Sequence, residues 1–164
     1  MKHKSVLLDE VINYLNIHED GTYVDATLGY AGHSGEVLKR LNEKGFLFAF
    51  DQDIEAIKYS NKKLSEINDN FIIINDNFCN MKKYINKEVD GIMFDLGVSS
   101  PQLDEAERGF SFHKDAELDM RMDKRNPLNA KIVVNEYSYD KLVDIFYRFG
   151  EEKYSKSIAK SIIE

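Results

Sequence analysis

The chain has 164 residues, of which 43% are hydrophobic, and its formal net charge is −7 at pH 7. This length can bury one sizeable core, so we expect a single domain, with at most an appendage. No run approaches the roughly 18 apolar residues of a membrane span, and the start lacks the apolar stretch of a signal peptide, so the sequence predicts a cytoplasmic protein without a membrane partner.

Charge and cysteine content restrict the possible partners. The acidic balance argues mildly against nucleic acid, because affinity for phosphates comes from Lys and Arg. Seven acids gather between Asp104 and Asp123, so the charge is uneven and a local basic surface stays possible. Cys79 is the single cysteine, which excludes an internal disulfide, and the four histidines are too dispersed for a metal-ligand spacing. We therefore expect no metal site.

Helical and strand patterns alternate along the first hundred residues. Helical spacing of apolar residues predicts helices at 8–15, around 37–41 and at 54–67. Short apolar or β-rich runs predict strands at 22–28, 46–50, 71–74 and 89–96, with a weakly helical segment at 78–86. Because the strands are apolar on both faces, the pattern predicts an α/β fold with a parallel sheet covered on both sides.

The pattern changes beyond Ser100. Residues 101–129 are charged and keep neither period, so we expect a long ordered loop or the edge of an insertion. From Ile132 helical spacing returns in two segments, and the second reaches Glu164 without a stop signal. Four strands also make a thin sheet, so the sequence suggests a fragment or a truncated gene.

Acidic residues stand at the end of every predicted strand. They are Asp25, then Asp51 with Asp53, then Asp76, and finally Asp95. Ligands of open parallel sheets bind beyond the carboxyl ends of the strands, so we expect these acids to line one site. A single acid in a loop is readily explained by chance, but acids at the ends of all four strands are harder to explain in this way. Asp51 also follows Gly32 by nineteen residues, near the offset of about 20 at which an acid binds a ribose hydroxyl.

The loop after the first strand carries Gly29, Gly32 and Gly35, spaced as G-x-x-G-x-x-G. The dinucleotide form, G-x-G-x-x-G, lets the backbone approach a pyrophosphate, and this loop departs from it. S-adenosylmethionine has ribose hydroxyls, an amino group and a sulfonium cation but no phosphate, so an acidic crevice suits it. Phe78 could pack against its adenine or be an ordinary core aromatic, and position alone leaves both open.

Three segments carry a family resemblance, namely DLGVSSPQLD at 95–104, EAERGFSF at 105–112 and LDMRMD at 118–123. This long and unusual series resembles the bacterial 16S ribosomal RNA cytosine-N4 methyltransferases. Residues 4–10, 25–34, 51–53 and 147–152 add to the resemblance, which thus spans nearly the whole chain.

The resemblance implies a Rossmann-like class I methyltransferase fold, incomplete in this chain. Residues 1–100 would bind S-adenosyl-L-methionine, and residues 101–164 would form a loop and the beginning of an inserted helical domain for substrate recognition. The implied activity is methylation of N4 of a cytidine in 16S rRNA of the small ribosomal subunit, with no DNA partner. Cofactor contacts are implied at Ala31, Gly32, His33, Asp51, Phe78, Asp95 and Gln102.

Asp95 is the expected catalytic residue, as an acceptor for the N4 hydrogens that stabilises charge on nitrogen. A carbonyl between residues 95 and 100 is the alternative acceptor, and whether Asp95 also removes a proton stays open. The family loop usually reads Arg-Gly-Gly-His where this chain has Tyr30-Ala-Gly-His33. The methyl group of Ala31 should be tolerated there if the backbone φ of this residue is negative.

Two other interpretations stay open. A nicotinamide-dependent oxidoreductase could use the same sheet, although the missing G-x-G-x-x-G disfavours it. The chain could also be a non-catalytic remnant that holds cofactor or RNA without turnover, because family members continue well beyond residue 164.

Overall fold

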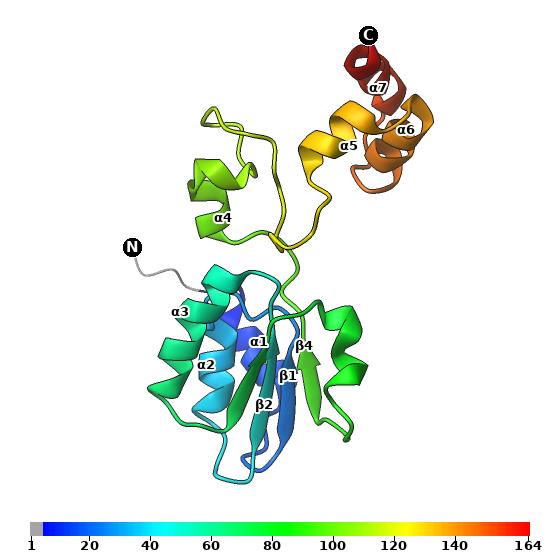
Figure 1. Cartoon of the computed structure of the whole chain (residues 1–164). Helices are drawn as coiled ribbons and strands as arrows, with labels where there is room; N and C mark the ends of the chain where they lie inside the picture. The colour runs from blue at the N-terminus through cyan, green and yellow to red at the C-terminus, as the bar shows by residue number, and fades with distance from the viewer. Residues whose placement is uncertain (1–4) are drawn as a thin grey trace. The chain divides into compact units, whose positions relative to one another are not determined.

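The computed structural model describes residues 5–164, which divide into a first unit ending at Gly97 and a second beginning at Val98 (Figure 1). Within these residues, every helix is too short or too polar to cross a membrane.

The first unit is built on a four-stranded parallel sheet. Its strands are β1 (Thr22–Asp25), β2 (Phe46–Phe50), β3 (Phe71–Ile74) and β4 (Gly91–Met93), in the order β3-β2-β1-β4. The chain therefore adds strands on one side of β1 and then crosses back to place β4 on its other side. Such a reversal of strand order is the topological switch point at which open α/β sheets bind ligands. The predicted parallel, Rossmann-like α/β sheet is confirmed.

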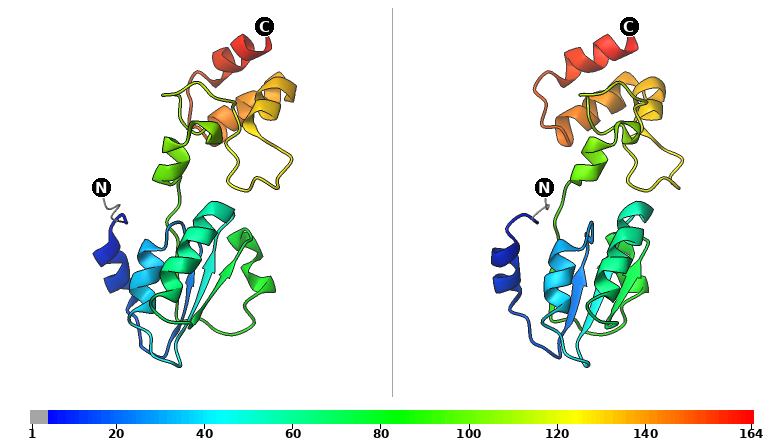
Figure 2. Two further views of the ribbon diagram at one scale, coloured as in Figure 1. Left: turned by 60° about the vertical axis from the view of Figure 1, so that its left-hand side comes forward. Right: turned by 90° about the vertical axis from the view of Figure 1, so that its left-hand side faces the viewer.

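Three helices pack on one face of the sheet, namely α1 (Leu8–Leu15), α2 (Gly32–Leu38) and α3 (Ile54–Ser65) (Figure 2). Alternate strand residues, among them Tyr23, Leu47 and Met93, are buried under this layer. The larger core thus lies between the sheet and these helices.

The opposite face is covered less completely than predicted. There Val24, Phe50 and Ile74 pack against the 3-10 helix η1 (Phe78–Lys83) and the segment after it. Ile72 and Ile92 also lie on this opposite face, because the residues next to them in their strands face the helix layer. These two residues are 46% and 40% exposed. The sequence pattern of apolar residues on both faces is correct, but within the described residues one of the faces is only partly buried.

The second unit holds the charged segment and the C-terminal helices. Two helical turns, α4 (Ser100–Asp104) and η2 (Ala106–Arg108), stand where we predicted only a loop. Three helices follow instead of two: α5 (Ala130–Glu136), α6 (Tyr139–Arg148) and α7 (Ser155–Ile163). Leu142 of α6 and Ala159 of α7 are fully buried, which gives this unit a small core of its own.

Candidate functional site

The acids at the strand ends meet at the carboxyl edge of the sheet, because all four strands run parallel. Asp25 is the last residue of β1, Asp51 directly follows β2, and Asp76 and Asp95 come two residues after β3 and β4. Asp25 and Asp95 flank the switch point, because β1 and β4 are neighbours.

Asp25 is almost completely buried at this edge, with 2% of its surface exposed. Its carboxylate accepts hydrogen bonds from the Ser34 hydroxyl at 2.6 Å and from the Thr27 amide at 3.0 Å. Burial nevertheless raises the pKa of the Asp25 carboxyl to about 6, because two hydrogen bonds only partly replace the water that the charged form loses. Asp25 therefore ties the end of β1 to the start of α2.

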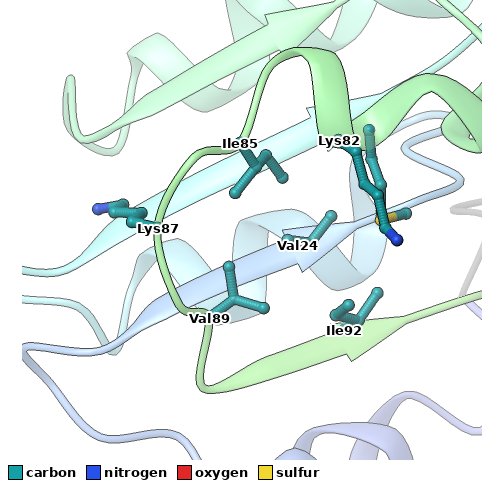
Figure 3. Close-up of a pocket in the computed structure, with 7 residues that line it drawn as sticks. Val24, Lys82, Ile85, Lys87, Val89 and Ile92 are labelled. Atoms are coloured by element: carbon teal, nitrogen blue, oxygen red, sulfur yellow. The ribbon is translucent and has the colours of Figure 1, made fainter.

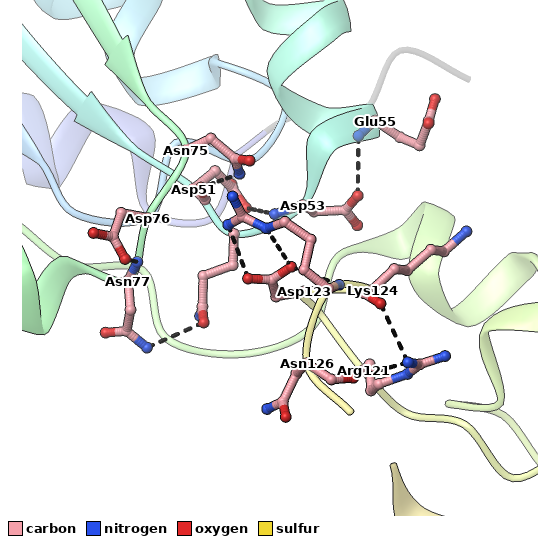
Figure 4. Close-up of polar contacts among 12 residues, drawn as sticks. Asp51, Asp53, Glu55, Asn75, Asp76, Asn77, Arg121, Asp123, Lys124 and Asn126 are labelled. Carbon is pink, nitrogen blue, oxygen red and sulfur yellow. Dashed lines mark hydrogen bonds and ion pairs between the residues drawn. The ribbon is translucent and has the colours of Figure 1, made fainter. Parts of the chain in front are cut away.

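Asp51 connects the end of β2 to the glycine loop. One carboxylate oxygen accepts from the Gly29 amide at 2.7 Å. The other accepts from the Asp53 amide at 2.8 Å (Figure 4). Burial is the main reason that the pKa of Asp51 is raised. Helix α3 holds the same loop through the Ser60 hydroxyl, which donates to the Gly29 carbonyl, and through Lys63, which donates to the Tyr30 carbonyl.

The glycine loop turns into α2 through a left-handed residue. Ala31, the N-cap of α2, has a φ of 54°, so the condition of a negative φ under which we expected an alanine to be tolerated there is not met. The left-handed region costs a residue with a Cβ about 1–2 kcal/mol. Ala31 also belongs to the core of the helix-covered face and is fully buried, so its methyl group gains burial that a glycine would not have.

A small cavity of about 140 Å³ lies beside Asp25 and Asp95. Its lining includes Val6, Leu7, His33 and Phe94. Pockets for drug-sized ligands enclose roughly 300–1,000 Å³, so this cavity fits a small group and not a whole nucleoside. The main chain of Asp95, one of the lining residues, is held in place by its amide, which donates to the Thr27 hydroxyl at 2.7 Å.

His33 lines the same cavity and is held by the N-terminal segment. Its Nε2 lies 3.0 Å from the Val6 carbonyl oxygen, and its Nδ1 lies 3.9 Å from a carboxylate oxygen of Asp95. The His33 side chain is 9% exposed, whereas the Asp95 side chain is 48% exposed. The pair thus joins a buried imidazole to a carboxylate that solvent and ligands can reach.

The other predicted residues have local structural contacts. Asp53 is the N-cap of α3 and accepts from the Glu55 amide (Figure 4). Asp76 accepts from the Asn80 amide group and the Tyr84 hydroxyl, and these hydrogen bonds lower its pKa. Phe78 begins η1, and its ring meets the ring of Phe94 edge to face at 5.4 Å.

Gln102 belongs to the second unit. There it forms a capping box with Ser99: the Gln102 side chain accepts from the Ser99 amide at 2.9 Å, and the Ser99 hydroxyl accepts from the Gln102 amide. Gln102 is buried, so its side chain fixes the start of α4.

A second cavity, of about 160 Å³, lies between the sheet and the segment after η1 (Figure 3). Val24, Ile85, Val89 and Ile92 line it together with Lys82. Since its lining contains no carboxylate, this cavity offers nothing that would recognise a sulfonium cation.

Sequence reasoning missed four residues that build the site: Thr27, Ser34, Ser60 and Val6. The three hydroxyls act by hydrogen bonds over 9 to 68 residues, and Val6 acts through its backbone. Only Ser34, directly after His33 in the glycine loop, carried a local signal. The others depend on which elements pack together, which no periodicity reveals.

Comparison with known proteins gives consistent results. A family model described as the MraW methylase family matches residues 1–164. The chain is 55% identical, over 99% of its own length, to ribosomal RNA small subunit methyltransferase H of Mycoplasma mycoides, and it spans 54% of that relative. A crystal structure of a Clostridium thermocellum protein described as an rRNA-methylase covers 60% of this chain, with 54% of its own length matched, at 32% identity and a TM-score of 0.53.

Proposed function

Because this chain belongs to the MraW methylase family, we propose that it takes a methyl group from S-adenosyl-L-methionine and transfers it to N4 of a cytidine in 16S ribosomal RNA. The observation that carries the proposal is the small cavity at the switch point, where Asp25, Asp95 and His33 meet. The names of the Mycoplasma mycoides and Clostridium thermocellum relatives support ribosomal RNA as the substrate class.

The chemistry of the site fits this cofactor. Carboxylates at the edge of the sheet attract a sulfonium cation and accept hydrogen bonds from ribose hydroxyls and an amino group, whereas they would repel phosphates. When bound, the cofactor supplies an activated methyl group. We assign its binding to the glycine loop at Ala31, Gly32 and His33, with Asp51 toward the ribose.

Three further assignments follow from the resemblance and are part of the proposal. Phe78, which begins η1 after β3, would lie near the adenine, and Asp95 and Gln102 near the methyl-transfer end. Asp95 would accept the N4 hydrogens of the cytosine. That hydrogen bond raises the electron density on a nitrogen whose lone pair is otherwise delocalised into the ring, and it stabilises positive charge as the new bond forms.

The two units would have different functions. We propose that residues 1–100 bind the cofactor and that residues 101–164 begin an inserted helical domain that recognises RNA. The target base must leave its stack to reach a cavity of this kind. We propose the small ribosomal subunit as the partner and the cytoplasm as the location, because the proposed substrate resides there.

The test is transfer of a labelled methyl group from S-adenosyl-L-methionine to small ribosomal subunits that lack the modification, followed by nucleoside analysis. We expect label in N4-methylcytidine. Label in adenine or on a ring carbon would overturn the assignment. Calorimetry with S-adenosyl-L-methionine and with a nicotinamide dinucleotide, run on the same protein, tests the cofactor separately.

A further inference from the structure

We propose that Nδ1 of His33 is a second acceptor for the amino group of the target cytosine and takes the proton that leaves N4. The inference rests on the proposed function and adds to it a residue for the proton transfer. It starts from the contact between the N-terminal segment and the glycine loop.

The Val6 carbonyl determines which nitrogen of His33 carries hydrogen. A carbonyl oxygen can only accept, so Nε2, at 3.0 Å from it, must donate. In the neutral ring Nδ1 then has no hydrogen, and its lone pair is free to accept. The tautomer is therefore set by a residue 27 positions away in sequence.

Nδ1 and Asp95 are consequently two acceptors side by side. They are 3.9 Å apart, which is too long for a hydrogen bond between them but suits a third atom that donates to both. An amino group bears two hydrogens and satisfies both acceptors at once. The carbonyl oxygen at the same ring position of uracil bears none, so the pair would select cytosine over uracil.

The same arrangement provides an acceptor for the proton that N4 releases after methyl transfer. The N4 lone pair forms the bond to the methyl carbon, and the carbon–sulfur bond breaks with its electron pair remaining on sulfur. N4 then carries a positive charge and releases one proton to the Nδ1 lone pair. The resulting imidazolium is flanked by the carboxylates of Asp95 and Asp25, which stabilise it.

The tautomer can be measured directly. Nitrogen-15 NMR of histidine-labelled protein at about pH 8.5, well above the ordinary titration of imidazole, distinguishes the two ring nitrogens. We expect hydrogen on Nε2 and none on Nδ1 of His33, assigned by loss of the signals in His33→Gln. Hydrogen on Nδ1 and not on Nε2 would overturn the proposal.

Binding of nucleotides tests whether Nδ1 of His33 accepts a hydrogen bond from the cytosine amino group. With S-adenosylhomocysteine present, we expect cytidine monophosphate to shift the Nδ1 resonance and uridine monophosphate to leave it unchanged. An equal response to both nucleotides, or to neither, contradicts the inference. Failure to bind S-adenosylhomocysteine in calorimetry would instead contradict the proposed function, while the tautomer would still be measured.

Two variants separate proton transfer from positioning. In His33→Gln the amide can still donate to the Val6 carbonyl but leaves no group at Nδ1, whereas His33→Asn places a non-basic amide near Nδ1. We expect both to lower the single-turnover rate of methyl transfer at least roughly a hundredfold, the usual contribution of general base catalysis. The rate is measured at saturating S-adenosyl-L-methionine, so a loss of the proposed cofactor contact of His33 does not enter it. Transfer by His33→Asn at the rate of the unmutated chain would show that no base is needed there.

Discussion

Gly32 and Ser5 are in such close contact that a Cβ on Gly32 would overlap the Ser5 hydroxyl. The glycine in the middle of the loop is therefore needed for a steric reason, with the N-terminal segment seated directly on it. This contact and the hydrogen bond between His33 and Val6 bring Ser5 and Val6 to the candidate site.

Gly32→Ala should displace the Ser5–Leu7 segment, because the new methyl group occupies the place of the Ser5 side chain. We expect a loss of stability of about 1–3 kcal/mol, the usual cost of overpacking, and weaker binding of S-adenosyl-L-methionine. Gly35→Ala is the matched control: its Cβ would lie 3.6 Å from Ile67, an ordinary contact, and helical alanine is favoured by about 0.5–1 kcal/mol. Urea denaturation measures the free energy of unfolding of both variants. Equal changes in the two variants would contradict the steric explanation.

Asp25→Asn should remove a pH dependence of stability. The folded pKa of about 6 exceeds the ordinary 3.8 of an unfolded aspartate, so the folded state holds more protons between these values. The contribution of Asp25 to the free energy of unfolding is therefore fully present below about pH 4 and is lost as the pH rises through about 6. The total loss is about 3 kcal/mol, since each pKa unit of difference corresponds to about 1.4 kcal/mol.

In Asp25→Asn this decline should be absent, because the amide does not ionise. Its oxygen can still accept from the Thr27 amide, and the Ser34 hydroxyl can accept from its nitrogen. Urea denaturation across this pH range measures the difference. Parallel curves for the two proteins would show that burial of Asp25 does not govern the titration.

Asp51→Ala should lower the affinity for S-adenosyl-L-methionine at least about tenfold, equivalent to about 1.4 kcal/mol. The substitution removes the proposed ribose acceptor and also releases the Gly29 amide, which Asp51 holds at 2.7 Å. Asp69→Ala deletes an equal charge from the exposed turn before β3, at the amino edge of the sheet. Calorimetry on both variants should show a loss for Asp51→Ala alone.

Asp95→Ala should reduce methyl transfer by about a hundredfold or more, the range found when one preorganised charge-stabilising group is removed. Cofactor affinity should change less, because the Asp95 side chain is half exposed and its backbone stays anchored on Thr27. Single-turnover rates with small ribosomal subunits, at saturating cofactor, give the comparison. Normal transfer by Asp95→Ala would remove this residue from the mechanism.

Arg108→Ala should loosen the charged segment of the second unit. Arg108 is 4% exposed, and its guanidinium donates to the Arg121 carbonyl at 3.0 Å while its own carbonyl accepts from the Met120 amide. Losing a buried charged hydrogen bond costs about 1.5–3 kcal/mol, so amide exchange around residues 117–121 should accelerate. Arg125→Ala, on the exposed part of the same segment, should have less than about 1 kcal/mol of effect.

The sequence by itself determined the elements and their class, because periodicity and turn residues are local properties. Strands that are apolar on both faces indicate a parallel sheet, and strand-end acids in a parallel sheet must share an edge. Segment ends were less accurate: β4 runs only from Gly91 to Met93, against the predicted 89–96, because hydrogen bonding to β1 ends there. The family resemblance came from residues 95–123, a series too long and unusual to arise by chance.

Only the tertiary structure decided which residues act together. The strand order puts Asp25 beside Asp95, and packing joins Thr27 to Asp95 over 68 residues and Val6 to His33 over 27. It also placed Ala31 in the left-handed region, where a local rule favours glycine. Such pairings depend on how the chain closes its loops and packs its helices on the sheet, and that information is not contained in any single segment.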